Sequence, residues 1–143
     1  MLAQAVRRNA RATVDAGSSC SMDREAFERI VRAAVAGIPA PLRERLQNVE
    51  VMVADWPSRR ELRDAEVPAG YTLFGLYTGI PLTERTSAYT MVLPDRITIF
   101  QGPLCEAFDD PDDLREEIRA TVIHEFAHFF GLSDDDLERM DAT

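Results

Sequence analysis

The two histidines of this chain lie four residues apart near its C-terminal end, and a glutamate directly follows the first of them. His124, Glu125 and His128 belong to the segment TVIHEFAHFFG, whose other residues are mostly apolar. Side chains at positions i and i+4 of a helix project from one face, so two imidazoles spaced in this way can bind the same metal ion. A carboxylate beside the first histidine can then act as a general base toward water at that metal. The spacing therefore predicts two ligands of a zinc site with a base next to them.

A catalytic zinc site needs a third protein ligand, and the chain has no further histidine. The candidates are the carboxylates that follow the motif, namely Asp134, Asp135, Asp136 and Glu138. Asp134 is preferred because Gly131 lets the chain turn at the helix end, and two extended residues beyond the glycine span only about 7 Å. In the competing interpretation, Asp134 caps a last helical turn and water completes the metal shell.

The histidine pair also has a purely structural interpretation, in which both rings are hydrogen-bonded residues of the core. Such core histidines are commoner than metal ligands. However, the chain places both of its histidines in one motif with a glutamate at the catalytic position. This arrangement favours the metal interpretation over the structural one.

The motif is predicted to lie in a long helix with clear signals at both ends. Asp110 is the expected N-cap, Pro111 suits the first helical position, and the acidic residues Asp112 and Asp113 favour the positive end of the helix dipole. Gly131 suits the left-handed conformation that ends many helices. These signals hold the motif in the last two turns of the helix.

The rest of the chain predicts an α+β domain that supports this helix. A first helix is expected within residues 21–39, followed by a helical turn within residues 40–47, and residues 57–70 are expected to form a charged surface loop. Alternating or β-rich segments predict strands at Asn48–Trp56, Tyr71–Leu82, Tyr89–Leu93 and Arg96–Gln101.

Two glycines interrupt the β-rich segment Tyr71–Leu82. Gly75 and Gly79 each suggest a β-bulge or a close approach of another part of the chain. Residues 1–20 are expected to form a flexible N-terminal tail, and residues 21–143 a single domain.

Charge and cysteine content limit the classes of partner and the cellular location. The net charge of −9 disfavours both nucleic acid and an anionic membrane surface, and no apolar run approaches the ~18 residues of a membrane span. Cys20 and Cys105 are the only cysteines and are expected to be free thiols. Free thiols fit a reducing compartment, so a cytoplasmic location is predicted.

The segment HEFAHFFGLSD resembles the HExxHxxGxxD signature of the aspartate zincins. Over about residues 23 to 140 the chain resembles the short bacterial zincin-like metallopeptidase family, also called minimal zincins, and the similar segments include IPAPLRERLQNVEVMV, LFGLYTGIPL and LPDRITIFQGPL. The resemblance implies that His124, His128 and Asp134 bind Zn²⁺ and that Glu125 is the catalytic base. It also implies that the strand Arg96–Gln101 is an edge strand along which substrate is aligned.

The motif and the resemblance together predict an α+β fold of the minimal zincin type. The expected parts are an N-terminal helix, a small mixed sheet of three to four strands and a long C-terminal active-site helix. The predicted function is a zinc-dependent metallopeptidase that hydrolyses peptide bonds through zinc-activated water, with Glu125 as general base and a peptide or protein as substrate. The alternative is a catalytically weak or inactive zincin-like module that binds a peptide or protein. By residue type alone, the candidates for an oxyanion stabiliser are Tyr71, Tyr77 and Tyr89.

Overall fold

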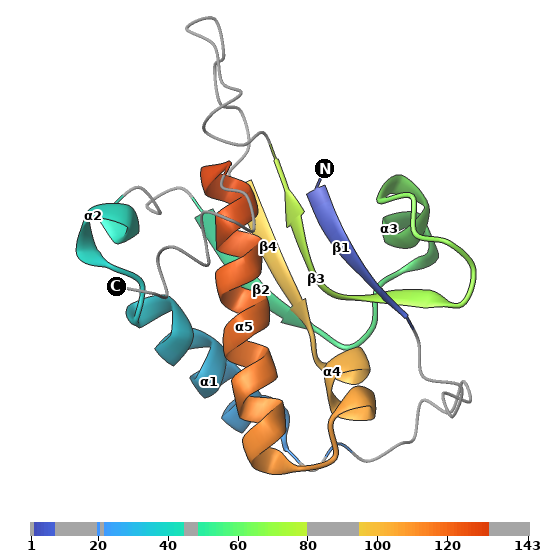
Figure 1. The fold of residues 1–143 in the computed structure, drawn as a ribbon, viewed down its shortest axis with the longest axis horizontal. Coiled ribbons are helices and arrows are strands. Elements are labelled where there is room, and N and C mark those ends of the chain that lie inside the picture. Colours follow the sequence, from blue (N-terminus) through green and yellow to red (C-terminus); the bar gives the residue numbers. More distant parts are fainter. Residues whose placement is uncertain (1, 8–19, 21, 45–48, 80–94, 132–143) are drawn as a thin grey trace, which may run out of the picture.

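The computed structural model describes residues 2–7, 20, 22–44, 49–79 and 95–131, which form an α+β fold around one four-stranded mixed sheet (Figure 1). The strands are β1 (Leu2–Arg7), β2 (Val49–Ala54), β3 (Tyr71–Thr78) and β4 (Asp95–Phe100). The helices are α1 (Arg24–Ala36), α2 (Ala40–Arg43), α3 (Arg59–Asp64), α4 (Gln101–Ala107) and α5 (Pro111–Phe130). The predicted fold, with an N-terminal helix, a small mixed sheet and a long C-terminal helix, is confirmed.

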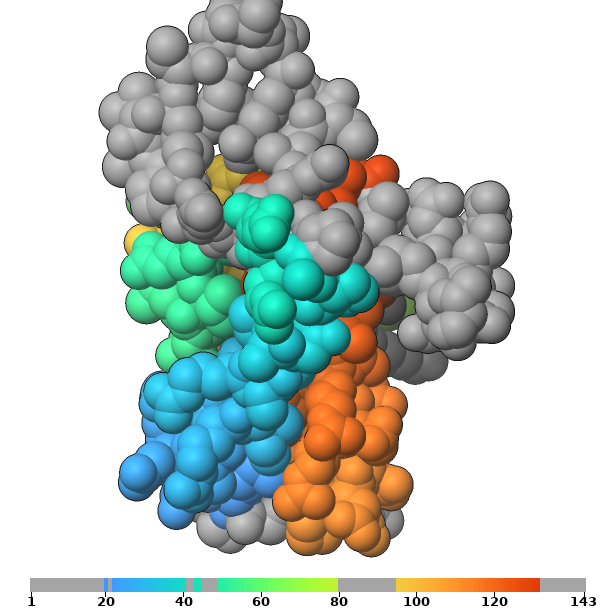
Figure 2. Space-filling view, turned by 90° about the vertical axis from the view of Figure 1, so that its left-hand side faces the viewer, coloured from blue at the N-terminus to red at the C-terminus, as the bar shows by residue number. Residues whose placement is uncertain are grey.

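The sheet separates a large apolar core from a small one. The larger core lies between the sheet and the helices α1 and α5, and it contains Phe27, Ile97, Ile99 and Ile118, all of which are fully buried. In Figure 2, α1 and α2 lie between β2 on one side and α5 on the other. The smaller core is formed by Leu73, Leu76 and Phe100 on the opposite face, where residues of α3 cover them. The long helix is therefore held against the sheet along its buried face.

Helix α1 follows the predicted pattern. The Asp23 side chain accepts a hydrogen bond of 2.7 Å from the Ala26 amide, and Gly37 is the C-cap. Phe27 and Val31, one turn apart, are buried against the larger core. Burial of side chains of this size stabilises the fold by about 1.5–3 kcal/mol each, which fixes α1 beside α5.

Strand β4 lies inside the sheet, so the prediction that Arg96–Gln101 is an edge strand was wrong. The strand order is β1-β3-β4-β2, and β4 pairs with β2 in parallel and with β3 in antiparallel orientation. The strand also ends at Phe100, because α4 begins at Gln101. The Gln101 side chain holds the start of α1 in place. It accepts a 2.6 Å hydrogen bond from Arg24 and donates one of 3.0 Å to the Met22 carbonyl. An alternating pattern predicts a strand, but its neighbours depend on distant segments.

Two other segments are more regular than expected. Within the predicted loop at residues 57–70, α3 begins with a capping box, in which Ser58 and Glu61 each accept a hydrogen bond from the other's backbone amide. Within the predicted tail, residues 2–7 form β1, which pairs antiparallel with β3. The division of the chain into a tail and one domain otherwise stays a prediction, and the predicted strand Tyr89–Leu93 lies outside the described residues.

Cys20 and Cys105 form a disulfide, so the prediction of free thiols was wrong. Their Cα atoms are 5.2 Å apart although 85 positions separate them in the sequence. The pairing follows from the packing of the segment before α1 against α4, which no local pattern reveals. Disulfides are typical of oxidising compartments, so the predicted cytoplasmic location loses its basis. In the described part of the chain, no helix has the length and apolar character needed to cross a membrane.

Candidate metal centre

The signals at the two ends of α5 fix the position of the histidine motif along the helix. The Asp110 carboxylate accepts hydrogen bonds from the amides of Asp112 (2.8 Å) and Asp113 (3.2 Å), and Pro111 occupies the first turn. Gly131 ends the helix with φ 71° and ψ 26°, the left-handed conformation that glycine adopts without strain. Both predicted end signals are confirmed, and the motif lies in the last two turns.

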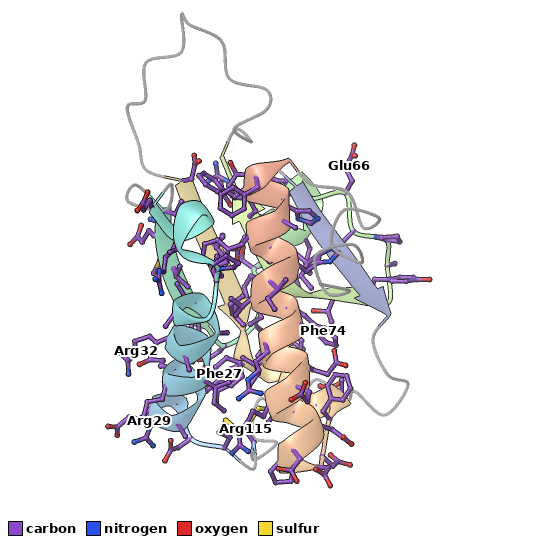
Figure 3. All side chains as sticks on the ribbon, turned by 60° about the vertical axis from the view of Figure 1, so that its left-hand side comes forward. Phe27, Arg29, Arg32, Glu66, Phe74 and Arg115 are labelled. Carbon is purple, nitrogen blue, oxygen red and sulfur yellow. A yellow bond between two sulfur atoms is a disulfide. The ribbon has the colours of Figure 1, made fainter. Side chains whose placement is uncertain are left out.

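The two histidines lie on the flank of α5 that faces away from α1. Phe126 is 2% exposed and belongs to the core shared with Phe27 of α1, and Figure 3 shows Phe27 between the two helices. At 100° per residue, His124 and His128 lie about 160–200° around the helix from Phe126. Since α1 and β1 lie on opposite sides of α5 (Figure 1), the histidines face the side of the molecule where β1 lies.

The imidazole rings of His124 and His128 are close neighbours on this flank. Their centroids are 4.7 Å apart, and the planes of the rings cross at 76°. Both residues are half-buried, and the His128 side chain is 19% exposed. The rings are therefore near enough to each other for one ion, and both residues remain partly accessible to solvent.

Glu125 points into the interior, in contrast to the histidines that flank it. The residue is 1% exposed. Its Oε2 atom lies 3.3 Å from Nδ1 of His128, without hydrogen-bond geometry, and neither buried atom has a hydrogen-bond partner among the described residues. A buried polar atom without a partner costs about 1–3 kcal/mol, and more when it is charged. Such a pair in an apolar helix indicates a site whose partner is not part of the described chain.

Gly75 makes room for the Glu125 side chain. A Cβ atom built on Gly75 would lie 2.8 Å from Cγ of Glu125 and 3.0 Å from Cγ2 of Thr121. The strand register places both Phe74 and Gly75 opposite a single residue of β1, so β3 has a bulge at this point. The prediction of a bulge or close approach at Gly75 is confirmed, and the close approach is to the candidate base.

The bulge explains why Phe74 and Gly75, which are consecutive in β3, both face the side of the sheet on which α5 lies. Phe74 contacts the ring of Phe108, with centroids 5.9 Å apart, and Tyr77 belongs to the same core as α5. Leu73 and Leu76 point to the other face, into the smaller core. The extra residue thus turns Gly75 toward α5 and leaves both cores filled.

The tyrosines proposed as oxyanion stabilisers have different environments. Tyr77 is fully buried, donates a 3.2 Å hydrogen bond to Asp95, and contacts Phe129 edge-on with the ring centroids 5.9 Å apart. Tyr71 is 39% exposed at the start of β3, and Tyr89 lies outside the described residues. Tyr77 therefore supports the last turn of α5 from below.

The residues present fit a zinc ion as far as the structure describes the chain. Imidazole nitrogen and carboxylate oxygen are the usual zinc donors besides thiolate. The two imidazoles lie side by side, and the buried Glu125 carboxylate lies next to His128. No three ligand-type side chains among the described residues are arranged to hold a metal ion together. Asp134, the predicted third ligand, lies outside the described residues, as do Asp135 and Asp136.

Sequence reasoning identified the motif but missed the parts of the sheet that support it. The contact between Gly75 and Glu125 and the position of β1 beside the histidine flank both depend on how distant segments pack. The glycine in a β-rich segment was the only local signal, and it did not indicate which residue would approach it.

Comparison with known proteins gives a family and a fold. The profile of the zincin-like metallopeptidase family matches residues 46–143, and no curated protein matches the chain. The structure is similar to that of a conserved hypothetical protein from Thermo thermophilus, with 23% identity, a TM-score of 0.52, and coverage of 84% of this chain and 98% of that chain. This likeness supports the fold alone. Because the family profile covers more than half of the 143 residues and includes the whole histidine motif, the chain belongs to the zincin-like metallopeptidase family.

Proposed function

We propose that this protein is a zinc-dependent metallopeptidase that hydrolyses peptide bonds, with His124, His128 and Asp134 as zinc ligands and Glu125 as the general base. The family supports the reaction class. The observation that carries the residue assignment is the Glu125 carboxylate, which is 1% exposed and has an unsatisfied oxygen 3.3 Å from a histidine nitrogen.

Zinc, when bound, supplies a Lewis acid that polarises the substrate carbonyl and makes water easier to deprotonate. The task of Glu125 is to accept a proton from the attacking water and to return it to the amine nitrogen that leaves. Its side chain is suited to this task because it lies close against the backbone of β3 at Gly75, where there is no room for a Cβ atom. A restricted base keeps its orientation between the two proton transfers.

The test is the variant Glu125→Gln, which removes the base but keeps the shape of the side chain. We expect zinc content, measured by mass spectrometry of metals, to match that of the parent protein. We expect peptide hydrolysis to fall by about 10²-fold or more, because the amide cannot accept the proton. The matched control is Glu116→Gln, the same change on the exposed surface of α5, where Glu116 only pairs with Arg119 at 3.2 Å.

The outcomes also separate the proposal from its alternatives. Equal rates for Glu125→Gln and the parent would exclude Glu125 as the base. Bound zinc and bound peptide without turnover in the parent would identify a binding module instead of a peptidase. Absence of stoichiometric zinc in the parent would leave the histidines as structural residues of α5.

A further inference from the structure

The sheet edge on the histidine side of the molecule is occupied by the first residues of the chain. In the order β1-β3-β4-β2, the edge strands of the described sheet are β1 and β2. Strand β2 lies on the side covered by α1, whereas β1 lies on the other side of α5 (Figure 1). The histidines face that same side, so β1 is the edge strand nearest to them.

The register of β1 places its first half beside the motif. Leu2 is paired with Tyr77, whose ring contacts Phe129 in the last turn of α5. Gln4 lies opposite the bulge that includes Gly75, the residue directly below Glu125. The backbone of residues 2–4 therefore runs in extended form next to the part of β3 that packs under the last two turns of α5.

An extended backbone in this place has the geometry of a bound peptide. Peptides often bind to proteins by adding a strand to an exposed sheet edge, where backbone hydrogen bonds hold them in register. Without β1, the edge presented to such a peptide would be that of β3, because β4 is paired on both sides. Strand β1 has six residues and pairs only with β3 in the described sheet, and short edge segments of this kind open at low free energy.

We propose that residues 2–7 are an intramolecular occupant of the β3 edge, and that an extended peptide substrate binds by displacing them. The occupant has the sequence Leu-Ala-Gln-Ala-Val-Arg, so the edge accepts a six-residue strand whose only charge is at its end. The identification of the displacing peptide as a substrate rests on the proposed peptidase function. The competition for the edge does not, because it involves backbone pairing alone.

The first experiment exchanges residues 2–7 for Gly-Ser-Gly-Ser-Gly-Ser in the full-length chain. Amide hydrogen exchange of residues 71–77 is followed in metal-free protein, with and without the capped peptide Leu-Ala-Gln-Ala-Val-Arg. In the parent protein we expect these amides to be protected from exchange in the absence of peptide, and we expect the peptide to bind weakly. In the exchanged variant we expect the β3 amides that pair with β1 to lose this protection, the peptide to bind at least tenfold more tightly, and the protection to return when it binds. Unchanged protection or absence of binding in the variant would overturn the proposal.

The second variant works in the opposite direction and keeps the strand in place. Val6 and Thr72 are register partners, and antiparallel partners have Cα atoms about 4.5–5.5 Å apart, within the range of a disulfide. The oxidised double variant Val6→Cys/Thr72→Cys should therefore bind the peptide at least tenfold more weakly than the single variants do. If the cross-linked protein binds the peptide with the same affinity as the single variants, β1 does not occupy the peptide site. This test remains valid even if the exchanged variant fails to fold.

Hydrolysis separates this inference from the proposed function. With zinc added, the exchanged variant should cleave peptides faster than the parent, while Glu125→Gln in the same background should bind peptide and not cleave it. Competition for the edge without any hydrolysis would support the role of β1 and refute the peptidase. Hydrolysis at the same rate with and without β1 would support the peptidase and refute the role of β1.

Discussion

The flank of α5 that faces α1 and the flank that carries the histidines are built from different kinds of side chain. On the α1 flank, Phe126 packs in one apolar core with Phe27 and Val31, all of them nearly inaccessible to solvent. On the histidine flank, half-buried imidazoles lie beside Glu125, whose buried Oε2 atom has no hydrogen-bond partner in the described part of the chain.

This difference shows how one helix can serve stability and chemistry at once. The apolar flank supplies contacts that hold α5 in one position, and these contacts are satisfied without any ligand. The other flank retains unsatisfied polar atoms that lower the stability of the metal-free protein. Substitutions on the two flanks should therefore differ in kind.

The largest effect is expected on the apolar flank. Phe27→Ala should lower the free energy of unfolding by about 3–5 kcal/mol, because it leaves a cavity between α1 and α5. The control is Ile123→Ala, since Ile123 is 43% exposed on α5 and its truncation should lower that free energy by less than about 1 kcal/mol. Urea denaturation measures both. Similar losses for the two variants would show that α1 does not anchor the helix.

Below the histidine flank, Gly75→Ala should lower the free energy of unfolding by about 1–3 kcal/mol. The added methyl would lie 2.8 Å from Glu125 Cγ, so the carboxylate must move and peptide hydrolysis should fall further than stability alone explains. Gly37→Ala is the matched control, because its Cβ would meet backbone oxygens only at 3.5 and 3.6 Å. If both variants retain full activity per folded molecule, the close approach does not position the base.

The third ligand is tested by zinc affinity. Asp134→Ala should weaken zinc binding at least tenfold, or by about 1.4 kcal/mol, because one of three protein ligands is lost. Asp135→Ala and Asp136→Ala should have little effect, with folding followed by circular dichroism. Equal losses at the three positions would indicate diffuse attraction between the acidic run and the ion, and Asp134 would not be the ligand.

The smallest effect is the most specific to the histidine flank. In metal-free protein, Glu125→Gln should leave the free energy of unfolding unchanged or raise it by up to about 2 kcal/mol, because a buried carboxylate with an unsatisfied oxygen is replaced by a neutral group. Thermal unfolding in the presence of a chelator measures the change. A loss of stability would mean that the carboxylate makes a favourable contact in the metal-free fold, contrary to the comparison of the two flanks.

The features that sequence predicted well are those encoded by neighbouring residues. The start of α5 at Asp110 and its end at Gly131 depend on side chains within one turn, and both were predicted correctly. The capping box Ser58–Glu61 was equally local, but the surrounding prolines and charges led to the prediction of a loop. The histidine motif is local too, although the assignment of its residues to zinc and to catalysis stays a prediction.

The features that were missed depend on segments far apart in the chain. Strand β4 was predicted as a strand, but its interior place follows from pairing with β2 and β3. Cys20 and Cys105 meet because the segment before α1 packs against α4. No pattern within a window of residues determines such pairings, since strand order and disulfide partners are set by the whole core.

The disulfide also gives the chain a covalent topology that determines what a single cut of the backbone releases. Residues 20 to 105 form a closed ring; β1 lies on the N-terminal segment that leaves it, and the histidine motif lies on the C-terminal segment. One cut between residues 20 and 105 would open the ring and leave the molecule in one piece until the disulfide is reduced. A cut before residue 20 would release β1 at once. Gels with and without reductant would therefore distinguish a nicked ring from a chain that has lost its first strand.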